Sequence, residues 1–220
     1  MSHDPPSRKD TAAAPVVFVV DDEAAVREAL SSLFRSVGLQ VVLFDSVADF
    51  LQRKLPDSSC CLVLDVRLPG MSGLDFQSEL ARVGIQLPIV FMTGHGDIPM
   101  SVRAMKAGAS DFLAKPFRDQ DMLDAVAAAL LRDRKARDNE RTAASLRNSY
   151  ELLTTREREV MALVTAGLMN KQVAAELSLS EITIKIHRGQ VMRKMSAKSL
   201  ADLVRMAESL GLPRTKSRRT

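Results

Sequence analysis

The chain has 220 residues, of which 46% are hydrophobic and 26% are charged, with a net charge of +4. This length predicts one large or two small domains, and the composition is typical of a globular protein with a buried core. A membrane span is excluded because no apolar run approaches about 18 residues. Residues 1–14 include acidic residues and no apolar stretch, which argues against a secretory signal and predicts a disordered arm.

The two cysteines, Cys60 and Cys61, are adjacent and lie inside an apolar run. A disulfide framework would need more cysteines, and a zinc site would need spaced ones. We therefore expect buried, reduced thiols on a strand, since a free cysteine behaves as a small hydrophobic residue. Reduced thiols fit a cytoplasmic location.

Charge is distributed unevenly along the chain. Residues 1–140 carry 16 Lys and Arg against 20 Asp and Glu, whereas residues 141–220 carry 15 against 7. A basic C-terminal part most often contacts a polyanion such as nucleic acid. The alternative is a basic surface that is merely solvated, and charge alone does not decide between them.

Residues 15–131 predict alternating strands and helices. Five short apolar runs are expected to be strands, at 16–20, 41–44, 62–64, 89–92 and 112–114. Apolar residues at helical spacing lie between these runs. The pattern predicts an α/β domain with a doubly wound parallel sheet of five strands. The last helix is expected to pack on this sheet through Leu123, Val126, Ala127, Leu130 and Leu131.

Polar side chains stand at or just after four of these strands: Asp21, Asp22, Asp65, Thr93 and Lys115. Ligands of such sheets bind at the carboxyl ends of the strands. Three neighbouring carboxylates repel one another unless a cation lies among them, and Mg²⁺ favours carboxylates together with phosphate oxygens. With a lysine and a hydroxyl beside it, an aspartate can accept a phosphoryl group. The alternative for each residue alone is an ordinary loop cap.

Four segments resemble the signature motifs of a two-component receiver domain. They are Val-Val-Asp-Asp-Glu at 19–23, Leu-Asp-Val-Arg-Leu-Pro-Gly-Met-Ser-Gly at 64–73, Met-Thr-Gly-His-Gly at 92–96 and Phe-Leu-Ala-Lys-Pro-Phe at 112–117. The resemblance implies that Asp65 accepts a phosphoryl group from a sensor histidine kinase. It also implies that Asp22, Asp65 and the backbone carbonyl of Arg67 bind Mg²⁺, with Asp21 acting through water.

The same resemblance implies roles around the acyl phosphate. Thr93 and Lys115 would contact it, and Phe112 would be the switch aromatic, although composition alone makes Phe112 a core residue. The bond between Lys115 and Pro116 is expected to be cis. Arg67 and His95 flank the expected phosphate and would tune its lifetime, with a solvated loop histidine as the alternative for His95.

Residues 132–149 are rich in charges of both signs and contain no Pro or Gly, which predicts a helical linker. A second domain is expected at 150–211, with four helices. Thr154 and Glu157 form a capping box for the first helix. Asn170 is expected to cap a helix at 171–177, Ser180 one at 181–195, and a last helix spans 198–210. Two helices joined by a short turn are typical of a helix-turn-helix, whose second helix enters the major groove of DNA.

The helix at 181–195 has two contrasting faces. Ile184, His187, Val191 and Met195 share one face and are expected to pack inward. The other face carries Ile182, Lys185, Ile186, Gly189 and Arg193. A mid-helix glycine such as Gly189 and an aliphatic side chain such as Ile186 are costly on a face exposed to solvent. Both fit a face that lies against DNA, where the backbone can approach closely and an aliphatic group can contact a thymine methyl. A poorly optimised surface is the alternative.

Residues 150–211 resemble the four-helix DNA-binding domain of LuxR-type regulators. The resemblance lies in Leu-Thr-Thr-Arg-Glu-Arg-Glu-Val at 153–160, Gly-Leu-Met-Asn-Lys-Gln-Val-Ala at 167–174 and Ser-Glu-Ile-Thr-Ile-Lys-Ile-His-Arg at 180–188. It implies base contacts from Lys185, Ile186 and Gly189, where relatives often carry a longer polar residue at the last position. It also makes Arg193 a DNA-facing residue, and candidate phosphate contacts are Lys171, Thr183, Arg188 and Lys194. The basic tail, 212–220, is expected to attract phosphate only nonspecifically.

The two domains together identify the chain as a response regulator of the NarL/FixJ class. The resemblance implies a sensor histidine kinase, double-stranded promoter DNA and RNA polymerase as partners, Mg²⁺ as cofactor and no membrane. It further implies a homodimer of the phosphorylated form through its fourth helix and fifth strand. Three alternatives stay open: a Mg²⁺-dependent phosphatase with Asp65 as nucleophile, an RNA-binding antiterminator that shares the receiver, and a regulator that works without phosphorylation.

Overall fold

The structure is a computed structural model that describes residues 14–94 and 98–212. It divides into two compact units, Met1–Arg137 and Asp138–Thr220. The predicted N-terminal arm up to residue 13, His95 and the basic tail from residue 213 lie outside the described residues.

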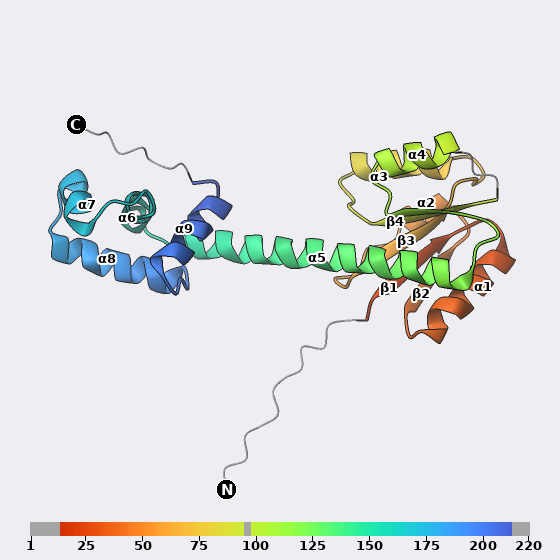
Figure 1. Cartoon of the computed structure of the whole chain (residues 1–220), viewed down its shortest axis with the longest axis horizontal. Coiled ribbons are helices and arrows are strands. Elements are labelled where there is room, and N and C mark those ends of the chain that lie inside the picture. The colour runs from red at the N-terminus through yellow and green to blue at the C-terminus, as the bar shows by residue number, and fades with distance from the viewer. Residues whose placement is uncertain (1–13, 95–97, 213–220) are drawn as a thin grey trace, which may run out of the picture. The chain divides into compact units, whose positions relative to one another are not determined.

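The first unit is built on a five-stranded parallel sheet (Figure 1). Its strands are β1 (Val16–Val20), β2 (Gln40–Phe44), β3 (Cys60–Asp65), β4 (Ile89–Thr93) and β5 (Asp111–Ala114). Their order is β2-β1-β3-β4-β5, so the chain changes direction across the sheet at β1. This confirms the predicted doubly wound fold, in which a ligand is expected beside β1 and β3.

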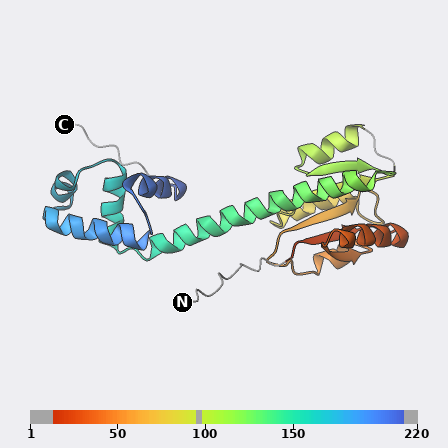
Figure 2. The same ribbon diagram turned by 60° about the horizontal axis from the view of Figure 1, so that its bottom comes forward.

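Helices cover both faces of this sheet. The helices α1 (Ala24–Ser36) and α5 (Asp119–Glu151) pack with the side chains of Val17 and Val19, whereas Phe18 and Val20 face α2 (Val47–Leu51) and α3 (Gly73–Arg82). The helix α4 (Ile98–Lys106) lies on the same side as α3. Figure 2 shows α1 and α4 on opposite sides of the sheet. Because β1 is buried on both faces, it reads as a continuous apolar run.

The buried stripe of α5 differs from the predicted one. The structure buries Met122, Ala125, Val126, Ala129, Leu130 and Asp133. Ala127 and Leu131 are exposed, so the prediction that they pack on the sheet was wrong. Leucine and alanine occur on several faces of this helix, so a shift of one residue gives an almost equally apolar stripe. The true stripe also contains a buried carboxylate.

Gly73 allows α3 to begin against the end of β3. A Cβ atom on Gly73 would lie 2.5 Å from the backbone oxygen of Asp65 and 3.1 Å from Cα of Val66. Its N–H donates to the carbonyl of Val66 at 2.9 Å. Backbone atoms cannot yield as a flexible side chain can, so residue 73 must be glycine for this contact to exist.

We therefore expect Gly73→Ala to destabilise the first unit by about 1–3 kcal/mol, the usual cost of overpacking. Urea unfolding of the full chain followed by circular dichroism measures this. Gly94→Ala is the control, because its Cβ would meet nothing within 4 Å. Equal midpoints for the two variants would contradict the close contact.

The second unit is helical, as predicted. It contains the end of α5 and the helices α6 (Thr155–Thr165), α7 (Asn170–Leu177), α8 (Glu181–Lys194) and α9 (Leu200–Ser209). Leu146 and Tyr150 of α5 pack against its core. The residues that fill its two apolar clusters include Leu153, Val160, Met161, Val164, Val173, Ile184, Val191, Met195 and Leu203.

The helix caps of the second unit agree with the sequence except at one position. The Thr154–Glu157 capping box and the Ser180 cap are present. Asn170 is not a cap: α7 begins at Asn170 itself, after Met169. The Asn170 side chain instead accepts a hydrogen bond from Arg188 of α8 at 3.0 Å. The predicted cap was therefore wrong, because this side chain bonds to α8 and not to the start of α7.

Cys60 and Cys61 are buried, free cysteines at the start of β3, as expected. Burial raises the pKa of the Cys60 thiol to about 11, with a further contribution from the charge of Asp133, and burial also raises the pKa of Cys61. Both thiols are therefore protonated at neutral pH. In the part of the chain that the structure describes, no helix is long and apolar enough to cross a membrane.

Candidate functional site

The predicted polar residues of the first unit gather at the carboxyl edge of the sheet. β1 and β3 pair with Val20 opposite Leu64, which brings the residues after them, Asp21 and Asp65, side by side. The Asp21 and Asp65 carboxylates accept hydrogen bonds from Lys115 Nζ at 2.8 and 2.7 Å. Parallel pairing thus joins three residues that are 44 to 94 positions apart in the sequence.

Each carboxylate is also oriented by the backbone. Asp65 Oδ1 accepts from the N–H of Arg67 at 2.8 Å, and Asp21 Oδ1 accepts from the N–H of Glu23 at 2.8 Å. Both residues are buried, with 5% of Asp65 and none of Asp21 exposed. The second oxygen of each carboxylate accepts from Lys115, so both carboxylates are held in a fixed orientation.

The charges at this edge influence one another. Burial raises the pKa of Asp21, against the opposing effect of its hydrogen bond to Lys115. Burial disfavours the charge of Lys115, but its hydrogen bonds to the two carboxylates outweigh this and raise the pKa of Lys115. Lys115 is therefore a charged ammonium group at neutral pH.

Asp22 lies at the same edge but is exposed. Among residues 14–94 and 98–212, no three His, Cys, Asp or Glu side chains are grouped closely enough to hold a metal ion. The donor chemistry nevertheless suits Mg²⁺, because carboxylates from adjacent strands and the backbone after Asp65 supply only hard oxygen ligands.

Thr93 and Phe112 lie on neighbouring strands, β4 and β5. Thr93 is buried at the end of β4, and its carbonyl accepts from the N–H of Lys115 at 2.7 Å. The half-buried Phe112 packs against Phe91, with ring centroids 6.3 Å apart. The bond between Lys115 and Pro116 is cis, as expected. Thr93 is thus connected to Lys115 through the backbone, and Phe112 stands where the core meets the surface.

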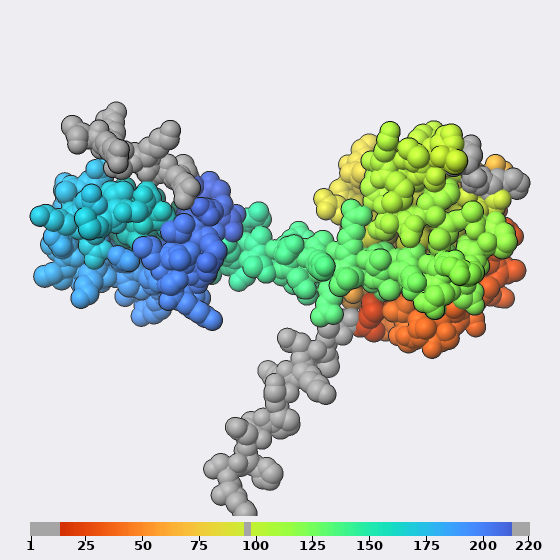
Figure 3. Space-filling model, in the orientation of Figure 1, coloured from red at the N-terminus to blue at the C-terminus, as the bar shows by residue number. Residues whose placement is uncertain are grey.

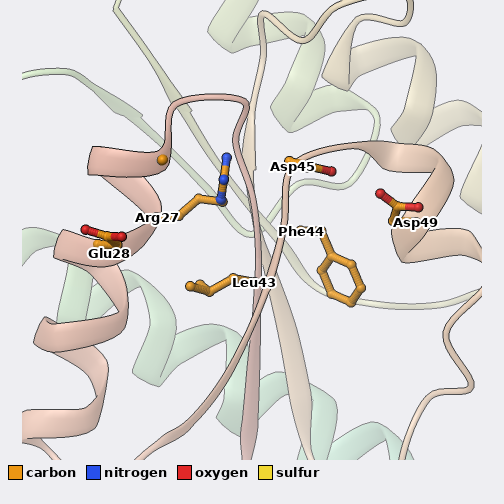
Figure 4. A pocket seen from close by; sticks show the side chains of 7 residues that line it. Arg27, Glu28, Leu43, Phe44, Asp45 and Asp49 are labelled. Atoms are coloured by element: carbon orange, nitrogen blue, oxygen red, sulfur yellow. The ribbon is translucent and has the colours of Figure 1, made fainter.

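Arg27 is a site-supporting residue that the sequence reasoning missed. Its guanidinium donates to the carbonyls of Asp21 and Asp22 at 2.7 and 2.9 Å. Arg27 lines an open pocket between α1 and the end of β2, shown in Figure 4. The sequence signal that could have indicated this role is the position of Arg27 in the first turn of α1, shortly after the two aspartates. Arg27 fixes the backbone that presents the two aspartates.

In the second unit, α8 exposes the face that was predicted to meet DNA. Ile182 is 74% exposed and Ile186 is 59% exposed, and Lys185, Gly189 and Arg193 are exposed on the same helix. A Cβ on Gly189 would meet nothing within 4 Å. On the inward face Ile184, Val191 and Met195 are buried, while His187 is half-buried. The two predicted faces are therefore present.

The candidate phosphate contacts differ in their surroundings. Lys171 is exposed at the start of α7, and the Thr183 hydroxyl lies 2.8 Å from that of Ser180. The Arg188 guanidinium donates to the side-chain oxygen of Asn170. Lys194 donates to the Glu157 carboxylate at 2.7 Å and to the carbonyl of Leu152 at 3.1 Å. Lys194 thus already has two partners inside the unit.

The ion pair between Lys194 and Glu157 ties the end of α8 to the start of α6. Glu157 is 4% exposed, and its carboxylate also accepts from the N–H of Thr154 at 2.7 Å. Burial alone would raise the pKa of Glu157, but Lys194 and the Thr154 N–H lower it below its ordinary 4.5. The ionised carboxylate is therefore the form that stabilises the fold.

We expect Glu157→Gln to reduce the stability of the second unit by about 1.5–3 kcal/mol at neutral pH, the range for a hydrogen bond to a charged group. Because the folded pKa is lowered, this contribution is complete above pH 4.5 and is lost as the pH falls through the folded value. Urea unfolding followed by fluorescence of Tyr150, the single tyrosine, reports on this unit. Glu159→Gln, in an exposed pair with Arg156, is the control. A difference between Glu157→Gln and wild type that persists or grows as the pH falls well below 4.5 would contradict the ion pair.

The geometry defines two modules, a doubly wound sheet with Asp21, Asp65 and Lys115 together at its carboxyl edge and a helical unit with the exposed helix α8. Family models match both: the response regulator receiver domain at residues 17–127, and bacterial regulatory proteins of the luxR family at 151–207. The chain is therefore a response regulator with a LuxR-type DNA-binding domain.

Relatives place it within this group. The chain is 64% identical over 197 residues to "Nodulation protein W" of Bradyrhizobium diazoefficiens, covering 90% of this chain and 87% of that protein. It is 50% identical over 197 residues to "Response regulator protein TodT" of Pseudomonas putida, with the same coverage. The chain belongs to the NarL/FixJ class of response regulators, as the sequence predicted.

Solved structures support this membership. The structure of the response regulator StyR has a TM-score of 0.82 and 48% identity, covering 89% of this chain and 99% of that one. Full-length FixJ from B. japonicum has a TM-score of 0.55 and 40% identity, covering 90% of this chain and 98% of that one. Both neighbours span nearly the whole chain.

Proposed function

We propose that Asp65 is the phosphoryl acceptor of this response regulator. One observation supports this most strongly: its carboxylate is buried, held by Lys115 and the Arg67 N–H, and points into the carboxyl edge of the sheet. In the reaction, an Asp65 oxygen attacks the phosphorus of a phosphohistidine on a sensor kinase. The bond from phosphorus to the histidine nitrogen breaks, and its electron pair stays on the imidazole.

Asp22, Asp65 and the Arg67 carbonyl would hold Mg²⁺, with Asp21 acting through water. A bound Mg²⁺ supplies positive charge for the phosphoryl oxygens during transfer. Lys115 and the Thr93 hydroxyl would contact the same oxygens. Lys115 leaves its pairing with Asp65 for the phosphoryl group, since the acyl phosphate carries more negative charge than the carboxylate did.

Phosphorylation would act through Thr93 and Phe112 on the α4 surface. Ile98, Val102 and Met105 stand one helical turn apart on α4 and are 79%, 42% and 45% exposed. They form an apolar row at the surface of the first unit, where α4 is visible in Figure 3. We propose that the phosphorylated form dimerises through α4 and β5, which places two recognition helices on successive half-sites of DNA.

We expect Val102→Asp to abolish the phosphorylation-dependent dimer, because it puts a charge at the centre of this apolar row. Sedimentation of the acetyl phosphate-treated full chain measures the dimer. Val37→Asp is the control, since Val37 is 52% exposed at the end of α1. The account of the interface would be contradicted if Val102→Asp dimerised as wild type does.

In the second unit we propose that Lys185, Ile186 and Gly189 face base edges and that Arg193 lies beside them. Lys171, Thr183 and Arg188 would contact phosphates, which positions the helix without reading sequence. Lys194 would reach a phosphate only by giving up Glu157. RNA polymerase, recruited at the promoter in a reducing cytoplasm, would be the final partner.

The test uses the full chain with Mg²⁺ and acetyl phosphate. Sites are selected from a pool of random DNA duplexes, and the affinity for the selected duplex is compared with that for RNA of the same sequence. We expect phosphorylation to raise the affinity for the duplex about 5- to 150-fold, the usual range of coupling between two sites. Preference for RNA would favour an antiterminator, steady turnover of a phosphomonoester would indicate a phosphatase, and equal DNA affinity in both states would indicate regulation without phosphorylation.

A further inference from the structure

A buried aspartate and a half-buried arginine on α5, Asp133 and Arg137, form an ion pair at the edge of the sheet opposite Asp65. Asp133 is 3% exposed, and its Oδ2 accepts from the N–H of Cys60 at 2.9 Å and from Nε of Arg137 at 2.6 Å. Cys60 is the first residue of β3, and Asp65 is the last. One strand therefore carries the proposed acceptor at one end and a bond to α5 at the other.

Arg137 extends this contact to the loop before β3. Its other nitrogens donate to the carbonyl of Pro56 and to Sγ of Cys60, both at 3.3 Å. We call Asp133 and Arg137, with their partners Pro56 and Cys60, the α5 clamp. All of its members belong to the first unit.

Beyond the buried Leu130, the clamp holds α5 against the first unit. Beyond Leu130, Asp133 is the one buried residue in the described length of α5. Residues 138–145 are exposed apart from the half-buried Ala143. The apolar packing that holds the earlier turns thus ends at Leu130, and directional polar bonds hold the next two turns.

We propose that the α5 clamp holds residues 131–137 of α5 against the first unit and that β3 connects the clamp to the phosphoryl site. The first part stands on the clamp geometry alone, and the second rests on the proposed function of Asp65. Charge-assisted hydrogen bonds that a buried carboxylate accepts depend strongly on distance and angle. A small displacement of β3 on phosphorylation therefore weakens or strengthens the hydrogen bonds of the α5 clamp. Apolar packing would tolerate the same displacement with little change in energy.

Arg137→Gln tests the first part, with Arg134→Gln as a matched control. Arg134 is exposed on the same helix one turn away and loses the same charge. Hydrogen exchange of the unphosphorylated full chain is measured over residues 134–145. We expect about tenfold faster exchange in Arg137→Gln, because local opening becomes easier, and wild-type exchange in Arg134→Gln. Equal exchange in the two variants would overturn the clamp.

The second part needs a readout that a purely structural role would not change. Arg137→Gln is expected to acquire the phosphoryl adduct at the wild-type rate, which also shows that the first unit is folded. Its gain in DNA affinity on phosphorylation should fall to less than about twofold, against the 5- to 150-fold expected for wild type. Arg137→Lys keeps the charge but not the planar set of guanidinium donors, so its gain in DNA affinity should lie between those of wild type and Arg137→Gln.

Asp133→Asn provides an independent check, since its amide oxygen can still accept from Cys60 while the ion pair is lost. Like Arg137→Gln, it should show faster hydrogen exchange over residues 134–145 and a smaller gain in DNA affinity on phosphorylation. A wild-type gain in DNA affinity in both variants would overturn the link through β3. If wild type itself showed no gain, the proposed function would fail, but the exchange comparison would still decide the clamp.

Discussion

Replacing Asp65 by Asn is expected to eliminate both the phosphoryl adduct and the rise in DNA affinity that acetyl phosphate produces. The amide keeps the shape of the carboxylate and can still accept from the Arg67 N–H, so the fold should survive. It lacks the anionic oxygen that attacks phosphorus. The 5- to 150-fold coupling expected between the two sites should therefore fall to about one.

Asp45→Asn is the matched control for this variant. Asp45 is exposed just after β2, so it makes the same chemical change near the same edge of the sheet without touching Lys115. Intact-mass spectrometry and DNA titration with and without acetyl phosphate provide the two readouts. Full activation of Asp65→Asn would contradict the assignment of the acceptor.

The second large effect is expected from Lys185→Ala on DNA recognition. An exposed lysine on α8 that contacts a base edge contributes about 1–3 kcal/mol of discrimination. The affinity for the selected site should therefore fall about 5- to 150-fold, with a much smaller loss on random duplex DNA. Fluorescence anisotropy with both duplexes at several salt concentrations measures this.

Lys171→Ala provides the contrast. Lys171 is exposed at the start of α7 and is proposed to contact phosphate. Its loss should weaken binding to both duplexes alike and reduce the salt slope by about one. If Lys185→Ala gave this same uniform loss, Lys185 would be a phosphate contact and the base-reading assignment would be wrong.

Much of the fold could be predicted because its pattern is local. The three central strands of the first unit, β1, β3 and β4, are short runs buried on both faces, and parallel strands leave their carboxyl ends on one edge. That topology is enough to bring Asp21, Asp65 and Lys115 together. The capping box of Thr154 and Glu157 is likewise a contact between near neighbours in sequence.

Contacts that depend on distant partners could not be predicted in this way. Asp133 looks like a solvent residue in a charged segment, yet its acceptor bond is to Cys60, 73 positions earlier. Its place on the stripe after Val126 and Ala129 was the only local signal. Asn170 has the chemistry of a cap, but Arg188, 18 positions later, uses its side chain.

The same limit applies to Lys194. From sequence it is a cation at the end of a recognition helix, where a phosphate contact is reasonable. The structure pairs it with Glu157, 37 positions earlier, because α6 and α8 pack against each other. A single sequence shows which side chains can pair, but the tertiary packing decides which of them meet.

Native mass spectrometry of the full chain with Mg²⁺, with and without acetyl phosphate, tests the central claim most directly. We predict a phosphoryl adduct on wild type, accompanied by a shift from monomer to dimer, and neither change in Asp65→Asn. An adduct that survives in Asp65→Asn would contradict the account, and so would a wild-type chain that acquires none from acetyl phosphate or phosphoramidate.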